Sequence, residues 1–108
     1  MAYFGDNAAE AWVNFHGTGT VAIRDSYNVS SITDHGTGDY DVNFSITFSN
    51  SNYAIAQGMP PINTNSFSGR GWALPRSRTT TKVNLEIMGD GGGAYDSNFV
   101  ELVAFGDR

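Results

Sequence analysis

Apolar and polar residues alternate with a period of two along several parts of the chain, which is the pattern of a β-strand with one buried face. The longest run covers residues 40–48 (YDVNFSITF), where every second side chain is hydrophobic without a break. The same period recurs in shorter runs at residues 21–24, 83–87, 11–15, 27–32 and 53–57. The pattern therefore predicts a chain built from half-buried strands.

Residues 99–105 (FVELVAF) carry a different pattern, because only Glu101 is polar. Phe99, Val103 and Phe105 fall on one side of such a strand, and the remaining apolar residues fall on the other. A strand that is apolar on both faces is central in a sandwich, or it packs one face on the core and the other on a neighbouring subunit. The sequence leaves both alternatives open.

Gly, Asn, Asp and Ser punctuate these runs at intervals of about 8 to 12 residues, a spacing typical of β-sandwiches and barrels. The tetrapeptide HGTG occurs twice, at residues 16–19 and 35–38, each time before a predicted strand. Glycine supplies the positive φ that tight hairpin turns need, so two related turns are expected. We predict an all-β fold, a single antiparallel β-sandwich that is jelly-roll-like.

A chain of 108 residues has the size of one domain with one hydrophobic core. We predict a flexible lead over residues 1–9 and a sandwich over residues 10–108, interrupted by a long loop at residues 58–81. That segment is rich in Pro, Gly and Ser and carries three arginines. Loops longer than about 12 to 15 residues are uncommon in compact domains and are often functional.

The charge and the hydropathy pattern exclude some partners. Six Lys and Arg against eleven Asp and Glu give a net charge of -5, which opposes capture of a phosphate backbone. No apolar run approaches the roughly 18 residues that a membrane helix needs, and the first residues lack the pattern of a signal peptide. Without cysteine, the chain has no disulfide and no thiolate metal site. We expect neither nucleic-acid binding nor membrane insertion.

Two long segments resemble a known family. Residues 11–24 (AWVNFHGTGTVAIR) and 27–40 (YNVSSITDHGTGDY) resemble a domain found near the C-terminal ends of phage tail-fibre and related virion proteins. The family pattern continues through the strand at 40–44, a variable middle at 58–77, a Thr-rich lead at 79–83 and a closing apolar strand at 100–106, so the resemblance covers most of the chain from Ala11. It departs at His16 and His35, where the family pattern has Asn, and in the middle loop.

The resemblance implies a virion protein of a phage appendage and assembly as a homotrimer, and it supplies no ligand and no catalytic motif. We therefore expect a non-enzymatic tail-fibre tip domain that adheres to a host polysaccharide or outer-membrane protein through exposed loops. The alternative is a structural module, capsid-decorating or fibre-capping, that binds other virion proteins. A third option, a free carbohydrate-binding module, lacks a clear line of exposed aromatic residues.

The long loop holds the predicted ligand-binding residues. Trp72 lies in polar, glycine-rich surroundings, so its side chain suits an interface hot spot or a sugar-stacking platform. The alternative is a tryptophan that folds back over the core. Trp12, which begins an apolar strand, is predicted in the core. The predicted ligand contacts are Phe67, Arg70, Trp72, Arg76 and Arg78.

The sequence gives weaker signals for metal binding and for catalysis. His16 and His35 are able to ligate a metal, but the HGTG turns already account for them, and we expect no metal site. The aspartates that sit near glycine lack the spacing of a calcium loop; they are Asp34, Asp39, Asp41, Asp90 and Asp96. Neither a P-loop nor a nucleophile elbow is present. We expect no catalytic residue and no cofactor.

Overall fold

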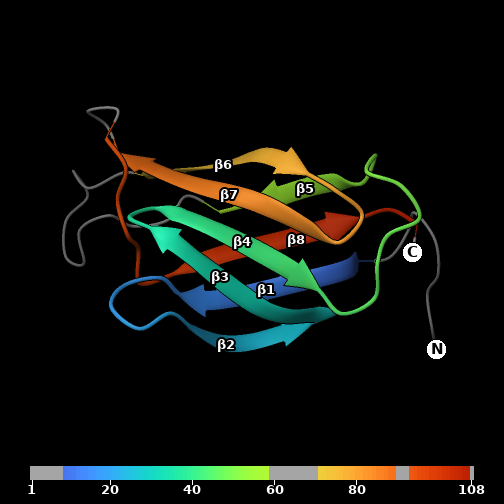
Figure 1. The fold of residues 1–108 in the computed structure, drawn as a ribbon, viewed down its shortest axis with the longest axis horizontal. Helices are drawn as coiled ribbons and strands as arrows, with labels where there is room; N and C mark the ends of the chain where they lie inside the picture. Colours follow the sequence, from blue (N-terminus) through green and yellow to red (C-terminus); the bar gives the residue numbers. More distant parts are fainter. Residues whose placement is uncertain (1–8, 59–70, 90–92, 108) are drawn as a thin grey trace.

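A computed structural model describes residues 9–58, 71–89 and 93–107, which form two antiparallel four-stranded sheets and, within those ranges, no helix. Sheet A has the order β2 (Ala22–Tyr27), β1 (Ala9–His16), β8 (Val100–Phe105) and β5 (Ala54–Gln57). Sheet B has the order β3 (Val29–Gly36), β4 (Asp39–Phe44), β7 (Lys82–Gly89) and β6 (Gly71–Arg78). In Figure 1, sheet B lies in front of sheet A.

The core fills the space between the two sheets, since the inward residues of their central strands are buried. The alternation predicted at residues 83–87 is confirmed: Val83, Leu85 and Ile87 are fully buried while Asn84 and Glu86 face outward. Three aromatic rings close one end of the core, with Phe48 stacked on Tyr53 at 4.3 Å and Phe44 edge-on to both. The other buried apolar residues are Ala11, Val13, Phe15, Val29, Tyr40, Val42, Ala73, Val100, Leu102 and Ala104.

Asn28 turns the chain from sheet A to sheet B. Its φ is 56°, in the left-handed region that Asn tolerates better than most residues. Its side chain donates to the carbonyls of Glu10 and Ile46, at 3.1 and 3.0 Å, and accepts from the amide of Ile46 at 2.6 Å. The strand predicted over residues 27–32 is confirmed from Val29, where β3 begins, whereas Tyr27 ends β2 and Asn28 forms the corner. The strand predicted over 40–48 ends early, at Phe44, since Asn28 satisfies the backbone of Ile46.

The glycines of the two HGTG segments have different structural roles. In the second, Gly36 and Gly38 have φ values of 135° and 65° in the turn between β3 and β4, as predicted. In the first, Gly19 has a φ of 57°, but Gly17 is required for space. A Cβ atom on Gly17 would lie 2.7 Å from the Tyr40 hydroxyl and 2.8 Å from the Ser97 carbonyl. The first segment therefore lets sheet A approach a tyrosine of sheet B.

The loop predicted at residues 58–81 is wrong for residues 71–78, which form β6 at the edge of sheet B. Buried Gly71 and Ala73 alternate with exposed Trp72, but small residues give that alternation little hydrophobic signal. Pro75 is tolerated because an edge strand needs only one side of its backbone for pairing. The register shifts between Pro75 and Ser77, so β6 carries a bulge there.

The prediction of a β-sandwich is confirmed as two facing antiparallel sheets around one core among the described residues. The strand order does not by itself carry the jelly-roll detail, because consecutive strands form hairpins within a sheet at β1–β2, β3–β4 and β6–β7. The predicted lead over residues 1–9 lies outside the described residues except for Ala9, which begins β1.

Candidate functional site

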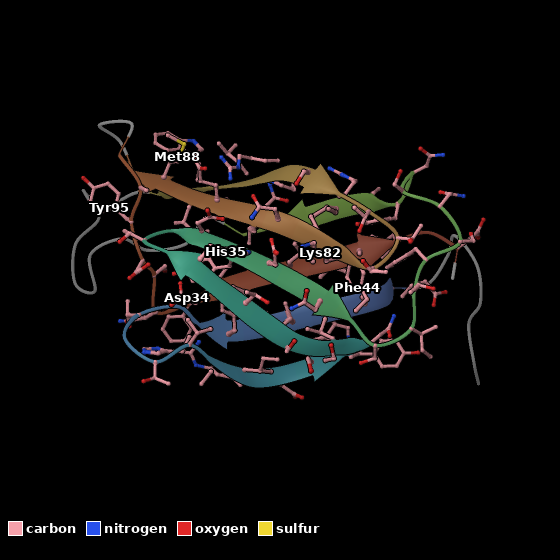
Figure 2. All side chains as sticks on the ribbon, in the orientation of Figure 1. Asp34, His35, Phe44, Lys82, Met88 and Tyr95 are labelled. Carbon is pink, nitrogen blue, oxygen red and sulfur yellow. The ribbon has the colours of Figure 1, made fainter. Side chains whose placement is uncertain are left out.

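Exposed apolar side chains gather at one end of sheet B. Trp72 and Leu74 of β6 are 44% and 42% exposed, and Tyr95 is 41% exposed. Trp72 is paired with Met88 of β7, and a bridge from Met88 to Ala94 brings Tyr95 to the same end. Figure 2 shows Met88 and Tyr95 at this end. We call Trp72, Leu74, Met88 and Tyr95 the Trp72 patch.

Arg76 lies on the same outer surface as Trp72, but its charge is already paired. Its guanidinium forms an ion pair with Glu86 at 2.6 Å and donates to Asn84 at 3.1 Å. A longer contact of 3.9 Å reaches Asp39. The structure thus brings two of the predicted ligand contacts, Trp72 and Arg76, onto one strand and one face. There Arg76 borders the patch as half of an ion pair.

Arg78 does not join them, because it points to the interior side of sheet B. Its guanidinium donates to the carbonyl of Tyr53 at 2.8 Å and lies 5.6 Å from the centre of the Tyr53 ring. Burial raises the pKa of Tyr53 to about 12, and the charge of Arg78 opposes that rise. The prediction that Arg78 contacts a ligand fits poorly with this geometry, in which it closes the end of the core. Phe67 and Arg70 lie outside the described residues.

Asp41 is the centre of a polar network on the outer surface of sheet B. Its carboxylate contacts the imidazole of His35 at 2.8 Å and the ammonium of Lys82 at 3.0 Å, and it accepts from Asn84 at 3.0 Å. Asn84 also donates to Asp39 at 2.8 Å. These groups lie on three neighbouring strands, with His35 on β3 and Lys82 on β7 (Figure 2). We call this set, with Arg76 and Glu86, the polar network of sheet B.

The network shifts the ionisation of its members. Burial opposes the charge of Asp41, but hydrogen bonds from His35, Asn84 and Lys82 outweigh it and lower the pKa of Asp41 to about 2. The hydrogen bond that His35 donates to Asp41, and then the negative charge of Asp41, raise the pKa of His35 above 6.5. Asp41 is therefore ionised at neutral pH, and in that form it interacts with His35, Lys82 and Asn84.

The two histidines considered as a metal pair lie in different sheets. His16 of β1 contacts the Thr18 hydroxyl at 2.8 Å and the guanidinium of Arg24 at 3.3 Å, whereas His35 contacts Asp41. Within the described ranges, no group of three or more His, Asp or Glu residues is arranged to hold a metal ion. Both histidines act as local hydrogen-bonding residues beside their glycines.

The aspartates considered for calcium are also engaged with the protein. Asp96 accepts from the amide of Gly38 at 2.9 Å and from the hydroxyl of Tyr40 at 2.8 Å. Tyr40 donates to the carbonyl of Gly17 at 2.6 Å as well, and burial raises the pKa of its hydroxyl. Asp34 accepts from the amide of Gly36. Asp39 and Asp41 belong to the polar network, and Asp90 lies outside the described residues.

The outer surface of sheet A carries a second group of exposed apolar residues, among them Phe99 at 49%, Tyr27 at 44% and Phe105 at 38%. Trp12 also lies here, half-buried, and the prediction that it belongs to the core is wrong. It is paired with Tyr27 on one side and Val103 on the other. In the sequence, this surface is indicated by the run at residues 99–105, whose second apolar side forms part of it. We call this outer surface, with Trp12, Tyr27, Phe99, Val103 and Phe105, the sheet A face.

A small hollow of about 170 Å³ lies at the edge of sheet A, lined by Ala56, Gln57, Gly58, Glu101, Leu102 and Val103. It is below the roughly 300 to 1,000 Å³ of typical small-molecule sites. Every buried side-chain nitrogen and oxygen in the described parts of the chain has a hydrogen-bond partner. The apolar surfaces are therefore the clearest candidates for recognition.

Over the described ranges, no helix is long and apolar enough to span a membrane. No family model, curated protein or solved structure gives a significant match to this chain.

Proposed function

We propose that this chain is a non-enzymatic virion domain at the tip of a phage tail fibre or a similar appendage, and that it adheres to a host-surface polysaccharide or outer-membrane protein. The likeness of residues 11–24 and 27–40 to appendage domains supports the virion assignment. A homotrimer with jelly-roll-like subunits is part of this proposal. Several copies in one fibre raise avidity without any new contact in each site.

The observation that carries the proposal is the Trp72 patch. A tryptophan that is 44% exposed on an edge strand, with exposed Leu74 on the same strand and Tyr95 at the same end of the sheet, offers flat apolar area at low cost in side-chain entropy. The Arg76–Glu86 ion pair adds polar groups at the border of the patch. Such a mixture suits the ring face of a sugar, or an aromatic hot spot on a protein. Adhesion would therefore depend on a strand surface as well as on loops.

The test is binding of the fluorescently labelled protein to a panel of intact bacterial strains and to polysaccharides extracted from them. We expect Trp72→Ala to reduce binding to any recognised strain by about tenfold or more, because hot-spot residues dominate an interface. Ile46→Ala is the matched control, since Ile46 is 55% exposed on a loop outside the patch. Equal binding by Trp72→Ala and wild type would contradict the role of the patch.

A second candidate function is a structural module that binds other virion proteins. The sheet A face favours it, because this apolar surface lies on the opposite sheet from the Trp72 patch. This function predicts that no strain in the panel is bound and that Trp72→Ala behaves as wild type. A pull-down from disrupted virions with the protein as bait would then recover another virion component.

A further inference from the structure

One row of the sheet A face is apolar across all four strands. Tyr27, Trp12, Val103 and Ala56 are direct neighbours in register, one from each strand. Phe105 lies between Ala9 and Ala54 in a second row. The inner surface of the same sheet already packs on the core. An antiparallel sheet with one face on the core ordinarily presents polar residues on the other, so this band calls for a covering partner.

Two opposite charges flank the centre of this face. Arg24 of β2 lies at the irregularity opposite Asn14 and Phe15, and its guanidinium donates to Asn14 at 3.1 Å and lies 4.1 Å above the ring of Phe99. Glu101 of β8 is opposite Asn14 on the other side of β1, with a contact of 3.5 Å to the Asn14 amide. In the part of the chain that is described, neither charge forms an ion pair.

These two charges belong to different halves of the face. Arg24 lies in the β2 half and Glu101 in the β8 half, with Asn14 of β1 between them. Asp25 lies in the same row, opposite Asn14, so the β2 half also carries a carboxylate, which accepts from the backbone amide of Ser26 at 2.9 Å. A second copy whose β8 half lies over the β2 half would bring its Glu101 to the guanidinium of Arg24.

We propose that the sheet A face binds a second copy of this chain, with Arg24 of one copy paired to Glu101 of the other. The inference rests on the self-association in the proposed function and is independent of adhesion to a host. Burial of Trp12, Tyr27 and Val103 in the contact supplies its apolar centre, and the pairing of Arg24 with Glu101 favours this register. A half-to-half contact of this kind closes a dimer about a two-fold axis and also closes a ring of three.

The test is a charge exchange followed by light scattering over a range of concentrations. We expect Arg24→Glu and Glu101→Arg each to raise the dissociation constant of the assembly by about tenfold or more, because like charges then meet. The double variant should recover most of the wild-type affinity. Thr37→Glu, at the exposed turn between β3 and β4, is the control for a change of net charge and should leave the mass unchanged.

Circular dichroism of each variant separates loss of association from loss of folding. Should Arg24→Glu unfold the domain by losing Asn14 and the Phe99 ring, Glu101→Arg still tests the same pair. A wild-type monomer at every concentration, or an assembly that ignores both single changes, would overturn the proposal, as would a double variant no better than the single ones. An assembly that obeys the exchange but binds no bacterial strain supports it and refutes only the adhesion.

Discussion

The two outer surfaces of the sandwich differ more than the two inner ones. On sheet B, the carboxylate of Asp41 contacts His35, Lys82 and Asn84, so the polar groups of this surface pair with one another. On sheet A, the corresponding area is a band of aromatic and aliphatic side chains around Trp12. The inner surfaces follow one rule, burial of alternate residues. The outer surfaces show that alternation on one face says nothing about what covers the other.

The largest expected effect comes from exchanging the two tryptophans of these surfaces for alanine. Trp12→Ala should raise the dissociation constant of the assembly by about 30-fold, because a central hot spot contributes about 2 kcal/mol or more. Trp72→Ala should leave it within about twofold. Analytical ultracentrifugation of both variants makes the comparison. Equal effects of the two substitutions would show that the sheet A face is not the contact.

A second comparison concerns one carboxylate from each surface. Asp41→Asn should lower the free energy of unfolding by about 1 to 3 kcal/mol, because it removes charge-assisted hydrogen bonds from a group with three partners. Glu101→Gln should change it by less than about 0.5 kcal/mol, since Glu101 has one long contact. Urea unfolding at a concentration where every variant is monomeric measures both. An Asp41→Asn variant as stable as wild type would mean that the polar network adds no stability.

The smallest expected effect is a pH dependence of thermal stability that arises from His35 on sheet B. His35 has a pKa raised above 6.5 in the folded protein, so its contribution is fully present below pH 6.5 and is lost as the pH rises through the folded pKa. Asp41, with a pKa of about 2, stays ionised throughout this window. The Tm advantage of wild type over His35→Gln should therefore shrink between pH 5.5 and about pH 8.

The control for that pH dependence repeats the comparison in the Asp41→Asn background. Removing the carboxylate removes the two largest causes of the raised pKa of His35 and leaves only the smaller effect of the Asp39 charge, so the Tm difference between Asp41→Asn alone and Asp41→Asn combined with His35→Gln should vary far less with pH. Differential scanning calorimetry at matched ionic strength follows each protein. A pH-dependent difference that persists undiminished without Asp41 would assign the effect to another group.

The sequence predicted those elements whose stability comes from their own alternation. The strand at residues 83–87 and the inner face of residues 99–105 are two such cases, and both are buried as expected. It missed the corner at Asn28, because the αL backbone there is held by Ile46, 18 residues away. It also missed β6, whose small residues and Pro75 acquire order from pairing with β7.

The candidate site was predicted in part for a similar reason. The sequence left open whether Trp72 is exposed or folds back over the core, and in the structure its side chain is exposed. The separation of Arg76 from Arg78 depends on the register shift between Pro75 and Ser77, which turns one side chain outward and the other inward. A local change of register leaves no mark in the composition. The placement of Arg24 beside Phe99 likewise requires strands far apart in the sequence.

Pro75 and the bulge beside it affect how readily the protein aggregates at high concentration. A free strand edge is a template on which further chains add without limit, and this leads to fibrillar aggregates. At the β6 edge of sheet B, the backbone lacks one N–H group at Pro75, and the regular pairing register is broken between Pro75 and Ser77. The β6 edge therefore resists open-ended growth by strand addition, even where many copies of the chain are concentrated together.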